Sequence, residues 1–359
     1  MGESIPFEMH TNKPRIPVRV NGAGPFDFLL DTGSVTDLID TQRADELGLA
    51  VSGHEEVGGA GDSTMTIAQA EGVALGVGSI DFPPQAITVA PIDERVGRHE
   101  GRRLDGLLGY DFFSRFPVEL DYDASVLTVR RDPPRGDHVP LQVVRRHPFV
   151  RLKLTFGAAT FEEIFVVDTG FRSAVVLARP FVEERGVLAR VDRTITATTG
   201  IGIGGPTVEL VGRADRVEIG PFALRDVVVA FSQAGAGTLA DGGFGGIVGS
   251  DLLRRFVATF DYPQEQLRLA PGAAFEAAFE FDLSGLFLTA ADGGVRVHSV
   301  VADAPAAQAG IQPGDRILTP GSLDELRLAL RSEIGAERLL SVEREGRRFE
   351  ARFVLERLI

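Results

Sequence analysis

The sequence predicts a mainly β protein, with two homologous β-rich units in tandem and a small α+β unit at the carboxyl end. Three observations lead to this prediction. The chain of 359 residues is long enough for two or three domains. Two long stretches of it repeat one another, and short apolar segments alternate with Gly and Pro clusters. The expected domains are residues 1–134, 135–272 and 276–359.

The repeat rests on pairs of matching segments that keep their order along the chain. Phe26–Gly33 matches Phe161–Gly170, and Asp105–Phe113 matches Gly245–Leu253. Two further pairs agree with these: Pro6 and Pro14 with Pro140 and Pro148, and Phe116–Tyr122 with Phe256–Tyr262. The offset between the copies stays between 134 and 140 residues, a drift that loop insertions explain.

Within the copies, short apolar-rich segments bounded by Gly and Pro predict strands. Four such segments are Ile16–Val20, Phe26–Leu30, Ile87–Ala90 and Val126–Val129. Two brief helices are expected at Thr41–Gly48 and Arg179–Gly186. Asp111 and Asp251 stand ahead of apolar pairs and are interpreted as helix N-caps.

Two polar stretches are expected to lie outside these elements. Residues 93–105 carry many charges and are interpreted as a solvated loop that could be nicked by a protease. Residues 131–137 are polar and helix-breaking, and are interpreted as the linker between the copies.

The carboxyl-terminal stretch does not repeat, and it alternates strand and helix signals. Val295–Val300 alternates as a half-buried strand does, and Ser322–Glu325 is a capping box that predicts a helix to about Ile334. The remaining expected elements are a short helix at 304–310, a turn into a strand at 313–318, and strands near 339–344 and 347–355.

The most informative motif is Asp-Thr-Gly, which occurs once in each copy at the end of an apolar strand. Asp31-Thr32-Gly33 follows Leu29-Leu30, and Asp168-Thr169-Gly170 follows Val166-Val167. The glycines permit a tight turn there. If the copies pack about a two-fold axis, Asp31 and Asp168 meet at that axis and share one proton, because adjacent carboxylates do not both ionise. Such a pair activates water without a metal or thiol.

A single Asp-Thr-Gly is most often a surface turn, so the spacing matters. Each motif is followed 76 or 79 residues later by an apolar-apolar-Gly stretch, Leu107–Gly109 in the first copy and Ile247–Gly249 in the second. The pairing of both motifs in both copies favours a functional reading over a structural one.

With these motifs, residues 1–271 resemble the single-chain, two-lobed bacterial aspartic peptidases of the retropepsin/pepsin clan. The resemblance implies two pepsin-like or retropepsin-like lobes that cleave peptide bonds through a water held between two carboxyls. It implies that Asp31 and Asp168 are catalytic. It also implies that Thr32 and Thr169 tie the two loops together, with Gly33, Gly170 and Ser34 supporting the site.

One position departs from the family pattern. Ser34 follows the first motif, whereas Phe171 follows the second. Because phenylalanine has no hydroxyl to donate to a carboxylate, Asp168 is expected to be less well supported as an anion. Phe171 is expected to narrow the substrate pocket or to tune the carboxyl pair.

Family members cover their cleft with hairpin flaps, and two glycine-rich stretches are the candidates. Gly59 and Gly61 mark the first, and Gly202 and Gly204 the second. The second stretch contains a G-x-G-x-x-G pattern, but strand-like residues 207–211 follow it instead of a helix. A dinucleotide site is therefore rejected.

Residues 280–359 resemble a bacterial PDZ domain. The resemblance rests on residues 284–288, 304–310 and 313–318. It implies that an extended peptide binds beside the helix that starts at Ser322, with the backbone amides of Gly285, Leu286 and Phe287 holding a terminal carboxylate. A unit that only packs on the two copies is the alternative.

Composition excludes several classes of function. The net charge of −14 opposes nucleic-acid binding, and the absence of cysteine excludes thiol nucleophiles and cysteine-bound metals. The six histidines are scattered, so neither a metal nor a cofactor is expected. No apolar run reaches the length of a membrane span.

The expected function is an aspartic endopeptidase that acts on polypeptide substrates, with a PDZ domain that recognises a peptide carboxyl terminus or regulates the enzyme. A monomer is sufficient, since one chain contains both aspartates. The alternatives are an inactive peptide-binding protein, which Phe171 favours, and an enzyme whose cleft is gated by the PDZ domain. No signal-peptide pattern is present, so the chain is expected in the periplasm or outside the cell if a leader was removed, and otherwise in the cytoplasm.

Overall fold

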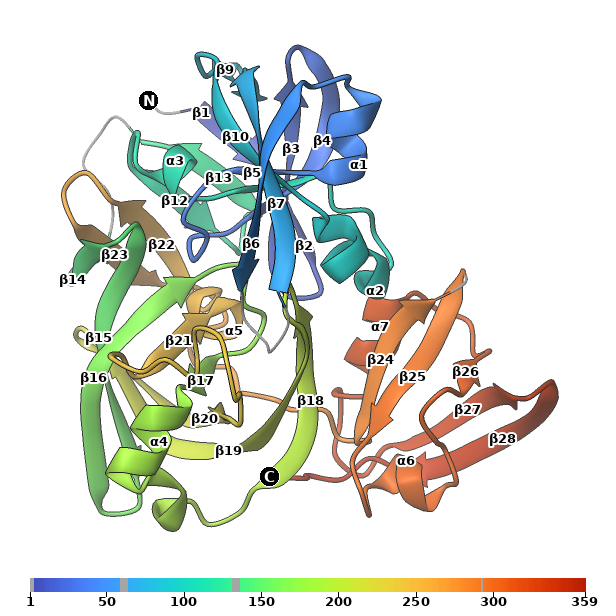
Figure 1. Ribbon diagram of the computed structural model, residues 1–359. Coiled ribbons are helices and arrows are strands. Elements are labelled where there is room, and N and C mark those ends of the chain that lie inside the picture. Colours follow the sequence, from blue (N-terminus) through green and yellow to red (C-terminus); the bar gives the residue numbers. More distant parts are fainter. Residues whose placement is uncertain (1–2, 59–63, 131–135, 292) are drawn as a thin grey trace.

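The computed structural model describes residues 3–58, 64–130, 136–291 and 293–359. The protein is mainly β, as the sequence predicts, with three sheets and short helices (Figure 1). Within the described residues, none of the helices has the length and apolar character needed to cross a membrane.

The two copies fold into sheets with the same strand order. In the first copy the order is β6-β7-β10-β5-β11-β4-β3, and in the second it is β18-β19-β20-β17-β21-β16-β15. The first-copy strands are β2 Glu8–His10, β3 Lys13–Val20, β4 Ala23–Leu30, β5 Leu38–Asp40, β6 Val51–Gly58, β7 Thr64–Val73, β8 Leu75–Val77, β9 Ile80–Asp81, β10 Gln85–Ala90 and β11 Gly106–Leu108. Those of the second are β15 His147–Phe156, β16 Ala159–Asp168, β17 Val175–Leu177, β18 Ile195–Gly202, β19 Gly205–Ile219, β20 Phe222–Ser232 and β21 Gly246–Gly249. The sequence repeat therefore corresponds to a structural repeat.

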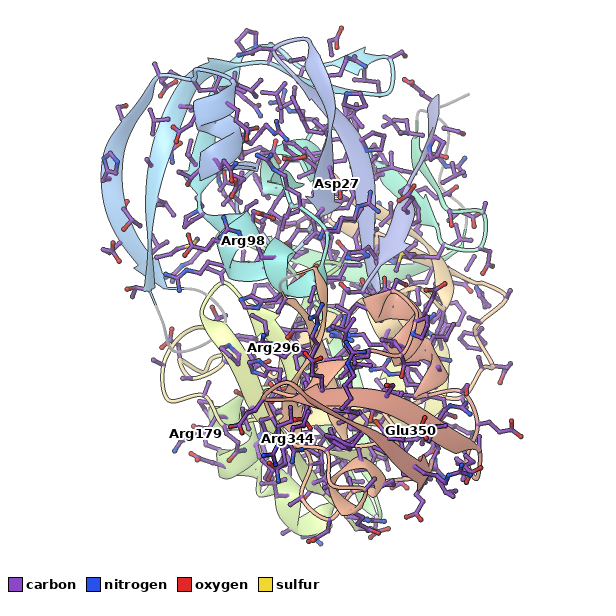
Figure 2. The ribbon with its side chains drawn as sticks, turned by 90° about the vertical axis from the view of Figure 1, so that its right-hand side faces the viewer. Asp27, Arg98, Arg179, Arg296, Arg344 and Glu350 are labelled. Atoms are coloured by element: carbon purple, nitrogen blue, oxygen red, sulfur yellow. The ribbon has the colours of Figure 1, made fainter. Side chains whose placement is uncertain are left out.

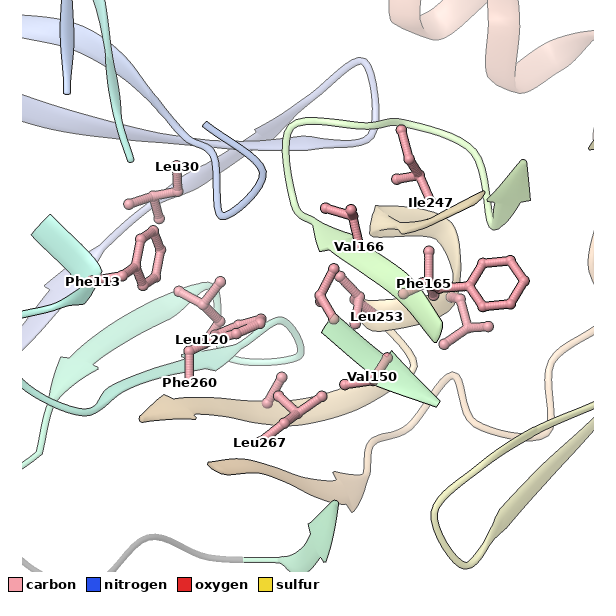
Figure 3. Close-up of a cluster of buried hydrophobic side chains, with 14 of the residues drawn as sticks. Leu30, Phe113, Leu120, Val150, Phe165, Val166, Ile247, Leu253, Phe260 and Leu267 are labelled. Carbon is pink, nitrogen blue, oxygen red and sulfur yellow. The ribbon is translucent and has the colours of Figure 1, made fainter. Parts of the chain in front are cut away.

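Six further strands join the copies. They lie in the order β1-β13-β12-β22-β23-β14 and comprise β1 Glu3–Pro6, β13 Val126–Val129, β12 Val118–Asp121, β22 Phe256–Asp261, β23 Gln266–Pro271 and β14 Asp137–Val144. The antiparallel pairing of β12 with β22 connects matching segments of the two copies directly. Phe113, Leu120, Phe260 and Leu267 belong to one continuous buried apolar cluster there (Figure 3). Burial of this cluster holds the copies together.

The carboxyl-terminal unit has its own sheet and core. Its strands are β24 Leu286–Ala291, β25 Gly294–Val300, β26 Arg316–Ile317, β27 Glu337–Arg344 and β28 Arg347–Val354, in that order across the sheet. Two helices accompany them, α6 Pro305–Gln308 and α7 Leu323–Ala329. The Ser322/Glu325 capping box starts α7 as expected, but the helix ends at Ala329 rather than near Ile334, where the chain turns toward the left-handed Gly335.

This unit contacts both copies, so it is not a freely suspended module. Asp324 of α7 accepts a hydrogen bond from the Thr11 backbone amide (3.2 Å) and lies 3.0 Å from His10 Nδ1. In the second copy, Ser299 donates to the Thr198 hydroxyl of β18 (2.8 Å). Figure 2 looks onto this unit, with Arg344 and Glu350 on its strands and Arg98 of the first copy above it. The edge strand β24 therefore faces the copies rather than open solvent.

Two local predictions for the copies are wrong. The helices α3 Tyr110–Phe113 and α5 Ser250–Leu253 have Gly109 and Gly249 at their N-caps, so neither Asp111 nor Asp251 caps a helix. Each lies inside the first turn. The Asp111 carboxylate instead accepts hydrogen bonds from the Thr36 hydroxyl (2.8 Å) and the Asp37 amide (3.1 Å), which bind it to the loop after the first motif.

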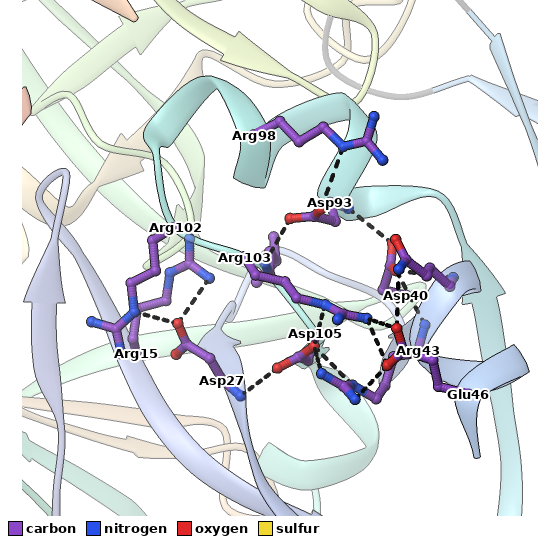
Figure 4. Close-up of polar contacts among 12 residues, drawn as sticks. Arg15, Asp27, Asp40, Arg43, Glu46, Asp93, Arg98, Arg102, Arg103 and Asp105 are labelled. Carbon is purple, nitrogen blue, oxygen red and sulfur yellow. Dashed lines mark hydrogen bonds and ion pairs between the residues drawn. The ribbon is translucent and has the colours of Figure 1, made fainter. Parts of the chain in front are cut away.

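Residues 93–105 are not a solvated loop. They form a π-helical turn, η1 Asp93–Gly97, followed by α2 Arg98–Glu100, and the latter packs against β24. Asp93 accepts from the Leu104 amide (2.9 Å), and Asp105 accepts from Arg43 (2.9 Å) (Figure 4). Because Asp93, Glu100 and Asp105 are buried and bonded inside the fold, this stretch is a structured support and a poor site for nicking. The other helices are α1 Thr41–Glu46, α4 Arg179–Arg185 and η2 Val187–Arg190.

Candidate active site

Each Asp-Thr-Gly motif lies at the end of a central buried strand. In the first copy β4 pairs in parallel with β11, with Leu30 opposite Leu108, and the Asp31 amide donates to the Leu108 carbonyl (2.9 Å). In the second copy β16 pairs in parallel with β21, so that Asp168 lies opposite Gly249. The apolar-apolar-Gly stretches are therefore the strands that fix where the two motifs end.

The two threonines bind the motif loops to each other. The Thr32 hydroxyl donates to the Val167 carbonyl (2.8 Å) and accepts from the Thr169 amide (3.0 Å). Thr169 does the same in reverse: its hydroxyl donates to the Leu30 carbonyl (2.7 Å) and accepts from the Thr32 amide (3.1 Å). Both side chains are fully buried, so these four bonds replace any contact with water. They hold the loops in one relative position.

The motif glycines allow the two carboxyls to approach. A β-carbon placed on Gly33 would lie 2.6 Å from Oδ2 of Asp168, and one on Gly170 would lie 2.5 Å from Oδ2 of Asp31. These distances are far shorter than real contacts of a β-carbon, so only glycine fits at either position. In this arrangement each carboxyl lies beside the glycine of the other motif, and both line the same cavity.

Backbone amides support each carboxyl separately. The Ser34 amide donates to Oδ1 of Asp31 (2.9 Å), and the Gly170 amide donates to Oδ1 of Asp168 (2.8 Å). The Ser34 hydroxyl does not take part, because it donates to the Thr36 carbonyl instead (2.8 Å). The expected difference between Ser34 and Phe171 in hydroxyl support is therefore absent from this structure. Phe171 contributes its ring to the wall of the adjacent cavity.

The pair is set up to hold one proton. Burial raises the pKa of Asp168 well above its usual value, and the nearby charge of Asp31 raises it further. Burial also raises the pKa of Asp31, but hydrogen bonds from Asp168 and from the Ser34 amide, and the positive charge of Lys13, oppose that rise. Of the two carboxyls, Asp168 is therefore the one that holds the shared proton more strongly.

Several residues of the site carry no motif and were missed at the sequence level. The Tyr262 hydroxyl donates to the Thr32 carbonyl (3.0 Å), and the Ser250 hydroxyl donates to the Thr169 carbonyl (2.7 Å). His147 Nδ1 lies 3.1 Å from the Gly33 carbonyl oxygen. Lys13 is buried beside Glu100, with which it forms an ion pair. The repeat itself was the available signal for Ser250 and Tyr262, because both lie within matched segments, Gly245–Leu253 and Phe256–Tyr262.

The carboxyl pair lines a cavity of about 530 Å³ between the two copies. Phe171, Gly202 and the neighbouring Ile203 also line it, which places the β18–β19 hairpin over the cleft. Gly204 lies between the two strands of this hairpin, outside the cavity lining. In the first copy, Val57 of β6 and Met65 of β7 line the cavity, while Gly59 and Gly61 lie outside the described residues.

The loop that precedes β24 differs from the expected carboxylate-binding loop. Oδ1 of Asp282 accepts from the amides of Gly285 (2.6 Å) and Leu286 (3.1 Å), and also from the amide and hydroxyl of Ser284 (2.9 and 2.7 Å). The prediction that the Gly285 and Leu286 amides are free to hold a ligand carboxylate is therefore wrong, because an internal carboxylate already uses them. Phe287, the third residue, lines the cavity of the carboxyl pair.

Within the part of the chain that the structure describes, no three His, Asp or Glu side chains are grouped closely enough to hold a metal ion.

Part of the chain is similar to a known protein family. Residues 16–112, which contain the first motif and the strand beneath it, match the family model described as aspartyl protease. Among solved structures, the aspartic proteinase from Irpex lacteus is similar, with 16% sequence identity, a TM-score of 0.49, and coverage of 77% of this chain and 99% of that one. No curated protein matches the chain.

Proposed function

We propose that this protein is an aspartic endopeptidase that hydrolyses peptide bonds within polypeptide substrates. The observation that carries the proposal is the close approach of the Asp31 and Asp168 carboxyls at the meeting point of the two copies, inside a cavity large enough for a peptide segment. The match of residues 16–112 to the aspartyl protease family supports it.

The chemistry follows from the unequal protonation of the pair. A water bound between the carboxyls gives a proton to the Asp31 carboxylate as its oxygen attacks the peptide carbonyl. Asp168 donates its proton to the carbonyl oxygen at the same time, which yields a neutral tetrahedral intermediate. When the C–N bond breaks, the proton on Asp31 passes to the leaving amine. A hydroxyl proton returns to Asp168, and the carbonyl of the new acid re-forms.

The carboxyl-terminal unit is proposed to be a PDZ-like module that helps to place the substrate. Its strand β24 contributes Phe287 and Thr289 to the wall of the same cavity that holds the carboxyl pair. A role in the cleft explains why this unit contacts both copies.

The direct test is cleavage of an unfolded protein from pH 3 to 8, with products identified by mass spectrometry. Activity requires one shared proton: it falls at low pH when Asp31 is protonated and at high pH when Asp168 loses its proton. Because burial raises both pKa values, we expect activity to persist above the pKa of an ordinary aspartate, about 3.9. If the wild type cleaves nothing at any pH, the protein is a peptide-binding protein instead.

A substitution at Ser34 tests how the first carboxyl is supported. Since its amide and not its hydroxyl contacts Asp31, Ser34→Ala should lower kcat/KM by less than about tenfold, the scale of one neutral hydrogen bond. The pH profile should keep its shape. A shift of the acidic limb in this variant would show instead that the hydroxyl turns toward Asp31 during catalysis.

A further inference from the structure

We propose that Arg172 and Arg327 bind the terminal carboxylate of the substrate, so that the enzyme cleaves at a fixed distance from a free carboxyl end. This inference rests on the proposed peptidase function and names its substrate class: polypeptides whose carboxyl terminus enters the cleft.

The two arginines come from different parts of the chain and meet at one place. Arg172 lies four positions after Asp168, and its backbone carbonyl is held by the Asn12 side chain (2.6 Å). Arg327 lies on α7 of the carboxyl-terminal unit. Their guanidinium carbons lie 5.8 and 5.7 Å from the centre of the Phe287 ring. Both therefore flank one aromatic side chain.

Both arginines face the cavity of the carboxyl pair. That cavity is lined by Asp31 and Asp168 and also by Arg172, Phe287 and Arg327. The same three residues also line a smaller neighbouring cavity beside the loop that precedes β24. The arginines thus lie where the second copy meets the carboxyl-terminal unit.

The positive charge at this end is incompletely matched. Among the described residues, none forms an ion pair with Arg172, and the nearest acids already have other partners: Glu100 pairs with Lys13 and Arg15, and Asp324 lies beside His10. The Arg327 side chain is 13% exposed, and its Nη1 donates no hydrogen bond and lies 3.9 Å from Asp324. Burial, followed by the charges of Arg327 and Arg331, lowers the pKa of Arg172, while Glu100 and Asp324 oppose that shift. A ligand anion placed between Arg172 and Arg327 would relieve this repulsion and satisfy the free donors.

A peptide carboxylate is the anion that suits the position. A peptide bound across Asp31 and Asp168 extends along the cleft, and its carboxyl end is the part that carries an anion by its nature. The loop amides of Gly285 and Leu286 are occupied by Asp282, and Arg327 donates to the Leu288 carbonyl (2.7 Å) at the edge of β24. Since Asp282 already accepts from these amides, the guanidinium groups of Arg172 and Arg327 are the donors proposed to bind the carboxylate.

The arrangement predicts how cut sites are distributed. Since the arginines and the carboxyl pair lie at fixed positions in one cavity, peptides of different lengths that share their carboxyl-terminal half should be cut at the same distance from that end. An acidic side chain could supply the same chemistry, so a peptide with a terminal amide and a glutamate as its last residue separates the two sources.

The experiment compares the free-acid, amidated, and amidated-glutamate forms of one peptide as substrates of the full chain. The free acid should have a kcat/KM about tenfold to a hundredfold higher than the amide, the scale of charge-assisted hydrogen bonds. Arg327→Gln should reduce this ratio to nearly one. Arg327→Lys should leave an intermediate ratio, because lysine keeps the charge but lacks the paired donors of a guanidinium group. Arg352→Gln, on the opposite edge strand of the same sheet, is the matched control and should keep the ratio.

Binding of the same labelled peptides to the Asp31→Asn protein, followed by fluorescence anisotropy, separates the two proposals. Tighter binding of the free acid without any wild-type cleavage would overturn the peptidase function and retain the carboxylate site. Equal cleavage and equal binding of acid and amide would overturn the carboxylate site alone. Preference for the amidated-glutamate form over the free acid would show that the arginines bind an acidic side chain. It would overturn the proposal that they bind the terminal carboxylate.

Discussion

Replacing Asp31 or Asp168 by asparagine is expected to lower kcat/KM by about a hundredfold to ten-thousandfold. Asparagine has nearly the same shape, but it neither takes a proton from water nor gives one to a carbonyl. Because both carboxyls act in each cycle, the two variants should lose activity to a similar extent. Cleavage of an unfolded protein and of a short peptide would measure the loss.

The same variants should not lose stability at neutral pH, which distinguishes a catalytic role from a structural one. Burial raises the pKa of both carboxyls, so the folded state holds protons more tightly than the unfolded state. The stability that this contributes is present at low pH and declines as pH rises from about 3.9 toward the raised values. An asparagine does not ionise, so the melting temperature should equal or exceed that of the wild type at pH 7.

The matched control is Asp81→Asn, in the same copy as Asp31 but on the surface, where the exposed carboxylate pairs with Arg19. It should keep wild-type activity. If either active-site variant retained more than a tenth of wild-type activity, the carboxyl pair would not be the catalytic centre.

Replacing Thr32 by valine is expected to cause the second largest effect. Valine keeps the shape of threonine but removes the hydroxyl that bonds Val167 and Thr169 across the two copies. The Val167 carbonyl and the Thr169 amide would then be buried without partners, at a cost of about 1–3 kcal/mol each. The free energy of unfolding should therefore fall by about 2–6 kcal/mol. Chemical denaturation would measure it.

Activity should fall with this variant as well, because the hydroxyls of Thr32 and Thr169 hold the two carboxyls close together. Thr155→Val is the control: its hydroxyl lies at the exposed face of β15, where it pairs with Thr160, and little change is expected. An unchanged stability of Thr32→Val would mean that water replaces the lost bonds and that the loops are less tightly joined than the four contacts indicate.

Much of the fold and of the candidate site could be predicted from the sequence alone, because the patterns that define them are local and repeated. Apolar strands that end in Asp-Thr-Gly, followed at a constant spacing by apolar-apolar-Gly, appear twice, and both copies adopt the same strand order. In each copy the same strand ends in the same Asp-Thr-Gly turn. The approach of Asp31 to Asp168 therefore follows from the symmetry of the repeat.

Other features of the fold depend on contacts between segments that are distant in the sequence, and no local pattern predicts them. The cap interpretation of Asp111 was wrong because the chain enters the helix directly from a strand, which leaves the carboxylate to bind Thr36. Residues 93–105 looked solvated because their charges are many, yet Asp105 accepts from Arg43 of α1, and Glu100 pairs with Lys13 and Arg15 of β3. Burial of a charge is decided by what surrounds it, and sequence composition does not contain that information.

The carboxyl-terminal unit shows the difference most clearly. Its strand and helix signals were local and readable, including the capping box at Ser322. Two other features depend on how this unit folds and docks. Asp282 occupies the loop before β24, and Arg327 lines the same cavity as Asp31. Docking is determined by matching surfaces built from residues more than a hundred positions apart, and only the folded chain brings those surfaces together.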